Sequence, residues 1–341
     1  MVSWSSVKPF VVMQGLNQSA WITQAAAYPF VVKDGPKPQP AEGQVLIRNV
    51  AVAIISLTYG RYLSTYPFIL GQDSAGIIEE MGSGVTNFKK GQRAIAFLAT
   101  CNGLMTQDPD NAAFQLYTVV TAQLVAEVPS SLELEQAVVL PLAVSTACAG
   151  LYRKDYLNLP LPSLTTGDKN KTGQTILIWG GASSVGATAI QLAAASGASS
   201  LGADIAFDYR SPSVVADIVK AIANTEFVGV YDAIGEEVSF APISALADLL
   251  KRPVNIASVL PCEKQTPLFA PKYVFAYSII QDPHKDIGDW IWGEFLPKAL
   301  ASGQFQAKPD SYIVGNGVKD IQNALDVQKE GVSAKKVVVT L

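Results

Sequence analysis

The pattern of hydrophobic and polar positions changes near Pro129. Before it, short apolar stretches alternate with turns rich in glycine, such as Gly82-Ser83-Gly84. Short strands joined by such turns are typical of a barrel-like β domain. We expect these strands within residues 44–54, 74–85, 88–97 and 115–120.

After Pro129 the pattern predicts helices and strands in alternation. A short helix over 132–141 and an alanine-rich helix over 142–152 come first. Strands are then expected at 175–179, 205–209, 229–233 and 254–259, with helices at 184–196, 214–223 and 242–250 between them. This alternation predicts a parallel sheet with helices on both faces. Helices at 290–301 and 318–329 and a strand at 335–341 complete the chain.

A glycine-rich turn follows the first strand of the second half. The segment reads Thr175-Ile176-Leu177-Ile178-Trp179-Gly180-Gly181-Ala182-Ser183-Ser184-Val185-Gly186, a buried strand, a turn and a helix start. Glycines at such a turn let backbone N–H groups approach a pyrophosphate, and the helix N-terminus attracts negative charge. The pattern predicts a dinucleotide site over Gly180–Gly186. The alternative is a tight strand–helix turn that binds nothing.

Two other strand ends belong to the same predicted sheet. Ile234-Gly235 ends one strand and Val259-Leu260 ends another. Ligands of open α/β sheets lie at the carboxyl ends of the strands, so these residues are candidates for contacts with a nicotinamide. Ordinary loop closure is the alternative.

Composition and charge exclude several classes of protein. The 341 residues carry a net charge of −4, with 49% hydrophobic and 16% charged residues. This balance disfavours nucleic-acid binding, which needs a basic face, and it disfavours disorder. We find neither a membrane-spanning stretch nor a secretory signal in the sequence, and we expect no membrane partner.

Cysteine and histidine are scarce. The three cysteines, Cys101, Cys148 and Cys262, are scattered, which suits a reducing compartment, and we expect a cytoplasmic protein. His284 is the single histidine, so neither a zinc site nor a histidine-based triad is expected, and we predict no metal ligands.

These motifs together resemble a known family. The segments 71–76 (Gly-Gln-Asp-Ser-Ala-Gly), 82–85, 89–93 and 140–142, followed by the glycine loop, are similar to those of the medium-chain dehydrogenase/reductase superfamily. The chain looks most like its zinc-independent branch of quinone reductases and fungal enoyl reductases that act with polyketide synthases. The resemblance implies an α/β protein with a GroES-like β-barrel catalytic domain (1–141 and 297–341) and a Rossmann domain (142–296). It also implies NADPH as the cofactor and a conjugated C=C or quinone as the hydride acceptor.

Zinc-dependent relatives differ at specific positions. They carry Gly-His-Glu where this chain has Gly71-Gln72-Asp73, and they carry a cysteine just after the strand that ends near Ile54. Neither zinc ligand is present, so the resemblance implies chemistry without zinc.

Residues that the family carries are missing at two places. Between Ser199 and Ser200, about 15 residues corresponding to a strand and a short helix are expected but absent. A second place lies at Ile54-Ile55, where relatives have a loop like Asn-Pro-x-Asp. We expect that the natural chain has residues there that this sequence lacks. A true deletion is the alternative.

The resemblance also nominates residues around the cofactor. Thr146 matches a threonine near the nicotinamide, and Tyr209 matches a tyrosine against the adenosine phosphate, with Arg210 beside it. A helix-start hydroxyl and a core tyrosine are the alternatives. Tyr59 and Tyr62, with Tyr66 after them, are candidate proton donors. A backbone N–H, a lysine in the missing loop or water could also donate the proton.

Three functions remain open at this point. The first is an NADPH-dependent reductase of small enones or quinones, and the second is a trans-acting enoyl reductase for carrier-bound thioesters on a polyketide synthase. The third is a cofactor-binding protein without catalysis, like a crystallin or a sensor. A monomer and a homodimer are both compatible with the sequence.

Overall fold

The structure, a computed structural model, describes residues 16–55, 63, 65–98, 108–165, 172–201 and 204–341. Its strands are β1 (Leu16–Ile22), β2 (Val31–Pro36), β3 (Gln44–Ala53), β4 (Phe68–Ile69), β5 (Asp73–Met81), β6 (Arg93–Phe97), β7 (Tyr117–Thr121), β8 (Val125–Glu127), β9 (Gln174–Trp179), β10 (Ser199–Leu201), β11 (Glu226–Asp232), β12 (Ile256–Ser258), β13 (Lys272–Tyr273), β14 (Asp310–Asn316) and β15 (Lys335–Thr340). Its α-helices are α1 (Leu134–Ala137), α2 (Pro141–Tyr152), α3 (Ser184–Ala195), α4 (Val214–Ile222), α5 (Glu237–Leu250), α6 (Lys285–Trp290), α7 (Leu296–Ser302) and α8 (Ile321–Glu330).

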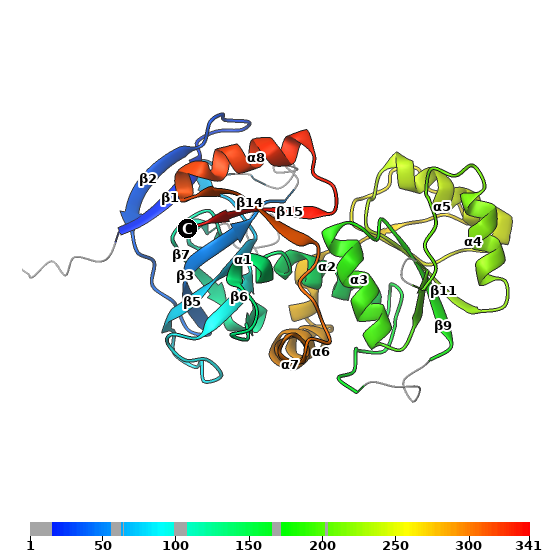
Figure 1. Cartoon of the computed structure of the whole chain (residues 1–341), viewed down its shortest axis with the longest axis horizontal. Coiled ribbons are helices and arrows are strands. Elements are labelled where there is room, and N and C mark those ends of the chain that lie inside the picture. The colour runs from blue at the N-terminus through cyan, green and yellow to red at the C-terminus, as the bar shows by residue number, and fades with distance from the viewer. Residues whose placement is uncertain (1–15, 56–62, 64, 99–107, 166–171, 202–203) are drawn as a thin grey trace, which may run out of the picture.

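The first half of the chain and its last strands form one β unit. Its main sheet has the order β14-β15-β3-β5-β6-β8, with β7 paired to β3, and a smaller sheet has the order β2-β1-β4. Val338 in β15 lies opposite Ala53 in β3, so the end of the chain completes a sheet begun near residue 44. Figure 1 shows β14 and β15 between α8 and the strands of the first half. The predicted barrel-like β domain is confirmed.

The second unit is a parallel sheet with helices around it. Its strand order is β10-β9-β11-β12-β13, and every pairing is parallel. After β9 the chain forms β10 on one side of β9 and then crosses back to form β11 on the other side. The strand order therefore reverses beside the end of β9. That point is where open α/β sheets bind ligands. The predicted doubly wound sheet is confirmed, with its helices on the right of Figure 1.

Helix α2 joins the two units. Eleven of its 12 residues are buried, and it packs against α3 and also against β5 and β6. A Cβ on Gly150 would lie 2.5 Å from the ring of Tyr231, so α2 approaches the parallel sheet closely. The stretch Leu134–Tyr152 is long and apolar enough to span a membrane, but 83% of its apolar window is buried inside the protein. Its apolar composition is therefore that of a core helix.

Several predicted elements differ from the structure. The strand expected at 205–209 is not formed, and the helix expected over 132–141 is only the single turn α1. The helix expected over 290–301 begins earlier, at Lys285, and contains a π-helical segment, Ile291–Phe295, before α7. Pro297 has no backbone N–H to donate inside this continuous helix, and the wider π-helical turn lies directly before α7.

The expectation of a strand missing between Ser199 and Ser200 is wrong in one respect. Both residues belong to β10, which pairs with β9 from Ser199 to Leu201. Serine-rich sequence gave no strand signal, and pairing along β9 decides the local structure instead. The sheet has no further strand beyond β10 among the described residues, whereas the common six-stranded order has one more. The domain limits at 141/142 and 296/297 stay a prediction.

Candidate active site

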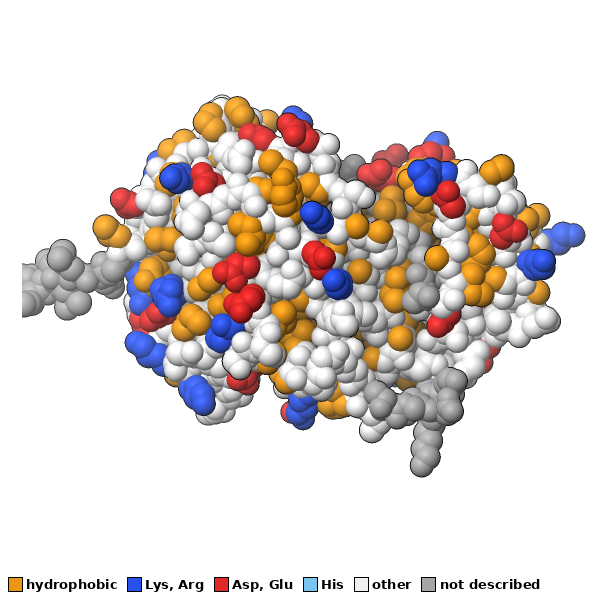
Figure 2. Space-filling model, viewed as in Figure 1, with side chains coloured by type: hydrophobic (Ala, Val, Ile, Leu, Met, Phe, Trp, Pro, Cys, Tyr) orange, Lys and Arg blue, Asp and Glu red, His pale blue; other side chains and the backbone are white. Residues whose placement is uncertain are grey.

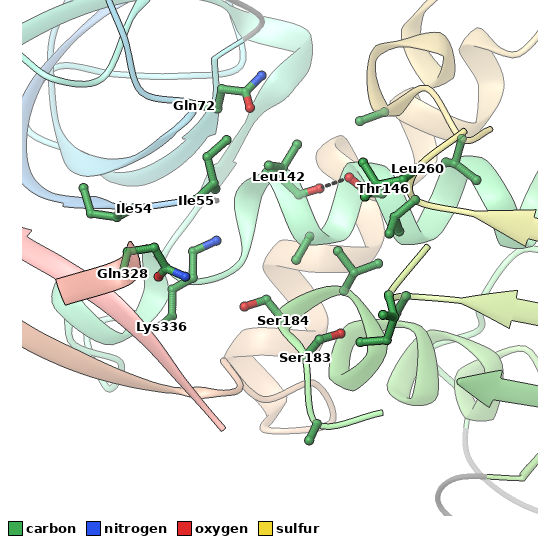
Figure 3. Close-up of a pocket in the computed structure, with 18 of the residues that line it drawn as sticks. Ile54, Ile55, Gln72, Leu142, Thr146, Ser183, Ser184, Leu260, Gln328 and Lys336 are labelled. Atoms are coloured by element: carbon green, nitrogen blue, oxygen red, sulfur yellow. Dashed lines mark hydrogen bonds between the residues drawn. The ribbon is translucent and has the colours of Figure 1, made fainter. Parts of the chain in front are cut away.

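A cavity of about 470 Å³ lies between the two units. The parallel sheet contributes the glycine loop and three strand ends, and the β unit contributes residues around β3, β5 and β15. Figure 3 shows Ser183 and Ser184 on one side of this space and Ile54, Ile55 and Gln72 on the other. Eight of the predicted cofactor residues line it: Thr146, Ala182, Ser183, Ser184, Val185, Ile234, Val259 and Leu260.

The glycine loop is held by close backbone contacts. Gly180 has φ +77°, a conformation that side chains rarely adopt, and a Cβ there would lie 2.6 Å from Ile234. A Cβ on Gly186 would lie 2.2 Å from the carbonyl oxygen of Gly180. Glycine is therefore required at both positions by the turn and by the packing of α3 on it. Gly181 and Gly235 flank residues of the cavity wall.

The N-terminus of α3 faces the cavity. Ser183 caps the helix, because its Oγ accepts a hydrogen bond of 3.1 Å from the N–H of Gly186. Among the described residues, no acceptor is found for the N–H groups of Ser184 and Val185, which are first-turn donors. Two free N–H groups and the positive end of the helix dipole make this wall suited to a phosphate group.

A buried ion pair lies at the opposite wall. Lys336, on β15, lines the cavity, and its Nζ lies 3.1 Å from Oδ2 of Asp73 at the start of β5. The other carboxylate oxygen, Oδ1, accepts a hydrogen bond of 2.6 Å from the N–H of Leu142 in α2. Burial raises the pKa of Asp73 above its usual value, and the charge of Lys336 offsets part of that effect. The pair thus ties three elements together beside the cavity.

Thr146 lies on the side of α2 that faces the cavity. Its hydroxyl donates a hydrogen bond of 2.7 Å to the carbonyl oxygen of Leu142, which Figure 3 shows as a dashed line. Its own carbonyl oxygen accepts one of 2.7 Å from the hydroxyl of Tyr231 in β11. Because the hydroxyl proton is used within the helix, Thr146 offers the cavity an acceptor.

The rest of the wall on the β side is mostly apolar. Ile54, Ile55 and Phe97 line it together with Leu142, and Gln72 adds an amide. Gln72 stands where zinc-dependent relatives have histidine, and among the described residues no group of three metal-ligating side chains exists. An apolar wall opposite the strand ends suits a hydrophobic acceptor held against a flat ring.

The model of the alcohol dehydrogenase GroES-like domain matches residues 41–130. The trans-enoyl reductase himH of Aspergillus japonicus is 40% identical over 350 aligned positions, covering 96% of this chain and 98% of himH. The dehydrogenase pigH of Monascus ruber is 36% identical over 373 positions, covering 95% and 99%. The chain belongs to the medium-chain dehydrogenase/reductase superfamily. It is an oxidoreductase of that superfamily, and the sequence-based assignment is confirmed.

Solved structures of the medium-chain dehydrogenase/reductase type share the fold. An alcohol dehydrogenase superfamily protein from Novosphingobium aromaticivorans has a TM-score of 0.73 at 24% identity, covering 95% of this chain and 99% of its own. A mycobacterial protein solved in complex with NADPH has a TM-score of 0.68 at 21% identity, covering 95% and 100%. A nicotinamide cofactor therefore fits the superfamily fold.

Both relatives are relevant to the missing residues, through the lengths over which they align with this chain. Those with himH and pigH run over 350 and 373 positions, which exceed the 341 residues of this chain. Each relative therefore has residues without a counterpart here. Whether they fall near Ile54 and Ser199, and whether the natural chain carries them, stays a prediction.

Some predicted residues of this superfamily member lie elsewhere. Tyr209 is 58% exposed, and Arg210 stacks on its ring at 5.6 Å while pairing with Asp208 at 3.0 Å. Tyr209 is not among the described residues that line the cavity. Tyr59 and Tyr62 lie outside the described residues, and Tyr66 packs against the hydrophobic core.

Sequence reasoning missed the C-terminal contribution. Gln328, Val332, Ala334, Lys335 and Lys336 all line the cavity, as do Tyr273–Ala276 after β13. A signal existed for Lys336, because it precedes three consecutive valines that form a buried strand. A lysine at the start of such a strand is a candidate for a buried ion pair rather than a solvated side chain.

Proposed function

We propose that this oxidoreductase binds NADPH between its two units and transfers hydride to a conjugated C=C of an enone, an enoyl thioester or a quinone. The observation that carries the proposal is the cavity itself, with a phosphate-suited helix N-terminus on one wall and an apolar wall opposite. The relatives named trans-enoyl reductases, himH and tndF of Aspergillus flavipes, support it. The NADPH complex of a protein with the same fold supports the cofactor.

The residues present fit a dinucleotide. The N–H groups of Ser184 and Val185 would hold the pyrophosphate, and the ammonium of Lys336 would add a positive charge at the same space. Val259 and Leu260 would lie along the nicotinamide, with Thr146 as an acceptor for its amide. NADPH supplies the hydride when bound, and the chain orients it and excludes water.

The acceptor also needs a proton. Hydride addition to one carbon of the C=C leaves an enolate, and protonation of the other carbon completes the reduction. Tyr59 and Tyr62 remain the proposed donors, with water or a backbone N–H as alternatives. Gln72 and the apolar residues around it would position the acyl part of the substrate.

A trans-acting role is the second candidate. The names of himH and tndF favour it, since both describe a reductase acting in trans. In this role the substrate is an enoyl thioester carried by a polyketide synthase in the cytoplasm. A third candidate, a cofactor-binding crystallin-like or sensor protein, would keep the cavity and lack turnover. Monomer and homodimer both stay open.

The first test is a fluorescence or calorimetric titration of the purified protein with NADPH and, separately, NADH. Saturable NADPH binding is expected, and binding of neither nucleotide would overturn the proposal. The second test follows NADPH oxidation with small enones, quinones and carrier-bound enoyl thioesters. Turnover only with the carrier-bound substrate would favour the trans-acting role, and binding without any turnover would favour the third candidate.

A further inference from the structure

Asp232 is a buried carboxylate at the end of β11, directly behind the cavity wall. Its exposed fraction is 0%. Oδ1 accepts hydrogen bonds from the N–H groups of Ile234 at 3.0 Å and Gly235 at 3.1 Å. Oδ2 accepts one of 2.8 Å from the hydroxyl of Ser239. A carboxylate is thus surrounded by three donors within seven residues of chain.

This carboxylate has no cationic partner among the described residues, because none of their ion pairs includes Asp232. Burying an unpaired charge is costly, so the three hydrogen bonds and the nearby start of α5 must compensate for it. Burial raises the pKa of Asp232, and the bonds from Gly235, Ile234 and Ser239 oppose that rise. A neutral side chain would avoid the cost, which indicates a specific use for this one.

The turn that Asp232 holds contacts both neighbouring strand ends. On one side, Ile234 packs so closely on Gly180 that a Cβ there would lie 2.6 Å away. On the other side, a Cβ on Gly235 would lie 2.7 Å from the backbone nitrogen of Leu260. Backbone hydrogen bonds reinforce both contacts, since Ala233 donates to Trp179 at 3.0 Å and Val259 donates to Asp232 at 3.1 Å.

We infer that Asp232 is a positioning residue for the cofactor: its carboxylate fixes the 233–236 turn against the glycine loop and Leu260. The residue itself does not line the cavity, whereas Ala233, Ile234 and Glu236 do. The inference rests on the proposed function, because it concerns how the NADPH site is shaped. Asp232 would affect cofactor binding only through the backbone of the neighbouring residues that it holds in place.

The test compares Asp232→Ala with Asp232→Asn by NADPH titration. Asn can still accept from both N–H groups through its oxygen and can donate to the Ser239 hydroxyl through its amide, so the turn survives. Asp232→Ala removes all three bonds. We expect the Kd for NADPH to rise about tenfold to a hundredfold in Asp232→Ala, as loss of hydrogen bonds to a charged acceptor predicts, and to recover most of that loss in Asp232→Asn.

Ile218→Ala is the control for a loss of stability alone. Ile218 is buried in α4 within the same hydrophobic cluster as Val230 and Phe240, away from the cavity. Its Tm should fall as in Asp232→Ala while its Kd for NADPH stays near that of the wild type. Equal Kd values for wild type and Asp232→Ala would overturn the inference. Equal losses of NADPH affinity in Asp232→Ala and Ile218→Ala would overturn it as well. A wild-type protein that binds no NADPH would instead overturn the proposed function.

Discussion

The ammonium of Lys336 and the carboxylate of Asp73 form an ion pair that is almost wholly inside the protein, with Lys336 7% exposed and Asp73 0%. The two residues lie far apart in the sequence, in β5 and β15, and meet beside the cavity. Removing one partner of a buried pair leaves the other charge unpaired, which costs far more than the pair itself contributes.

The first prediction concerns this pair. Asp73→Asn should lower the free energy of unfolding by about 3–5 kcal/mol, because Lys336 then lacks its counter-charge. The double variant Asp73→Asn/Lys336→Met should recover most of that loss. Urea unfolding of the wild type, both single variants and the double variant measures the coupling. Additive losses would show that the pair is not coupled.

The second prediction uses two glycines of the loop. Gly186→Ala should abolish NADPH binding and destabilise the protein by about 1–3 kcal/mol, since its Cβ meets rigid backbone at 2.2 Å. Gly181→Ala is the matched control. There a Cβ meets only the end of the Ile190 side chain, at 3.0 Å, and φ is not positive. The Tm of Gly181→Ala should stay near that of the wild type. A similar fall in Tm for Gly181→Ala and Gly186→Ala would contradict the close-contact argument.

Thr146 supplies the third prediction. Thr146→Val keeps the shape of the side chain but removes the acceptor, so KM for NADPH should rise about three- to tenfold with little change in Tm. Thr146→Ser retains the hydroxyl and should behave like the wild type. Steady-state kinetics at saturating acceptor provide the measurement. A rise in KM for Thr146→Ser without a rise for Thr146→Val would point to the lost methyl group instead.

A fourth prediction concerns the pH dependence of stability. The pKa of Asp232 is higher in the folded protein than its ordinary value of 3.8, so the folded state holds this proton more tightly than the unfolded chain. The contribution to stability is therefore present below the unfolded pKa and is lost as the pH rises through the folded pKa. Asp232→Asn removes this dependence.

Denaturant unfolding of wild type and Asp232→Asn between about pH 4 and about pH 7 gives the measurement. The stability of Asp232→Asn relative to the wild type should increase over that interval. A difference that stays constant with pH would mean that Asp232 does not titrate differently in the two states.

The fifth prediction concerns metal removal. Gln72 replaces the zinc-binding histidine of the zinc-dependent relatives, and the described residues hold no cluster of metal-ligating side chains. Dialysis against a chelator should therefore leave turnover and Tm unchanged. A loss of turnover that added zinc restores would contradict the assignment to a zinc-independent branch.

How far sequence reasoning reached depended on the range of each interaction. The glycine loop was predictable because strand, turn and helix start are neighbours in sequence, and the segment from Thr175 to Gly186 carries the whole signal. The partner of Lys336 was not predictable, because Asp73 is brought to it only by the pairing of β15 with β3 and of β3 with β5. Such pairings leave no local pattern.

Strand β10 and Tyr209 show two other limits. Ser199–Leu201 has no strand propensity, and its structure comes from the neighbouring β9. The expected strand over 205–209 had a favourable apolar pattern but is reduced to a single bridge residue, Ile205, and Tyr209 lies at the surface. Tertiary context decided both outcomes.

The closing of the β unit by β15 has a consequence for biosynthesis. Since β15 follows the whole parallel-sheet segment along the chain, the β unit cannot acquire its full sheet until that later segment has left the ribosome. The contiguous parallel-sheet unit can fold first, as domains made of one stretch of chain generally do during synthesis. Lys336 would then reach Asp73 only after the parallel-sheet unit has formed, so the cavity wall beside this ion pair would be completed late.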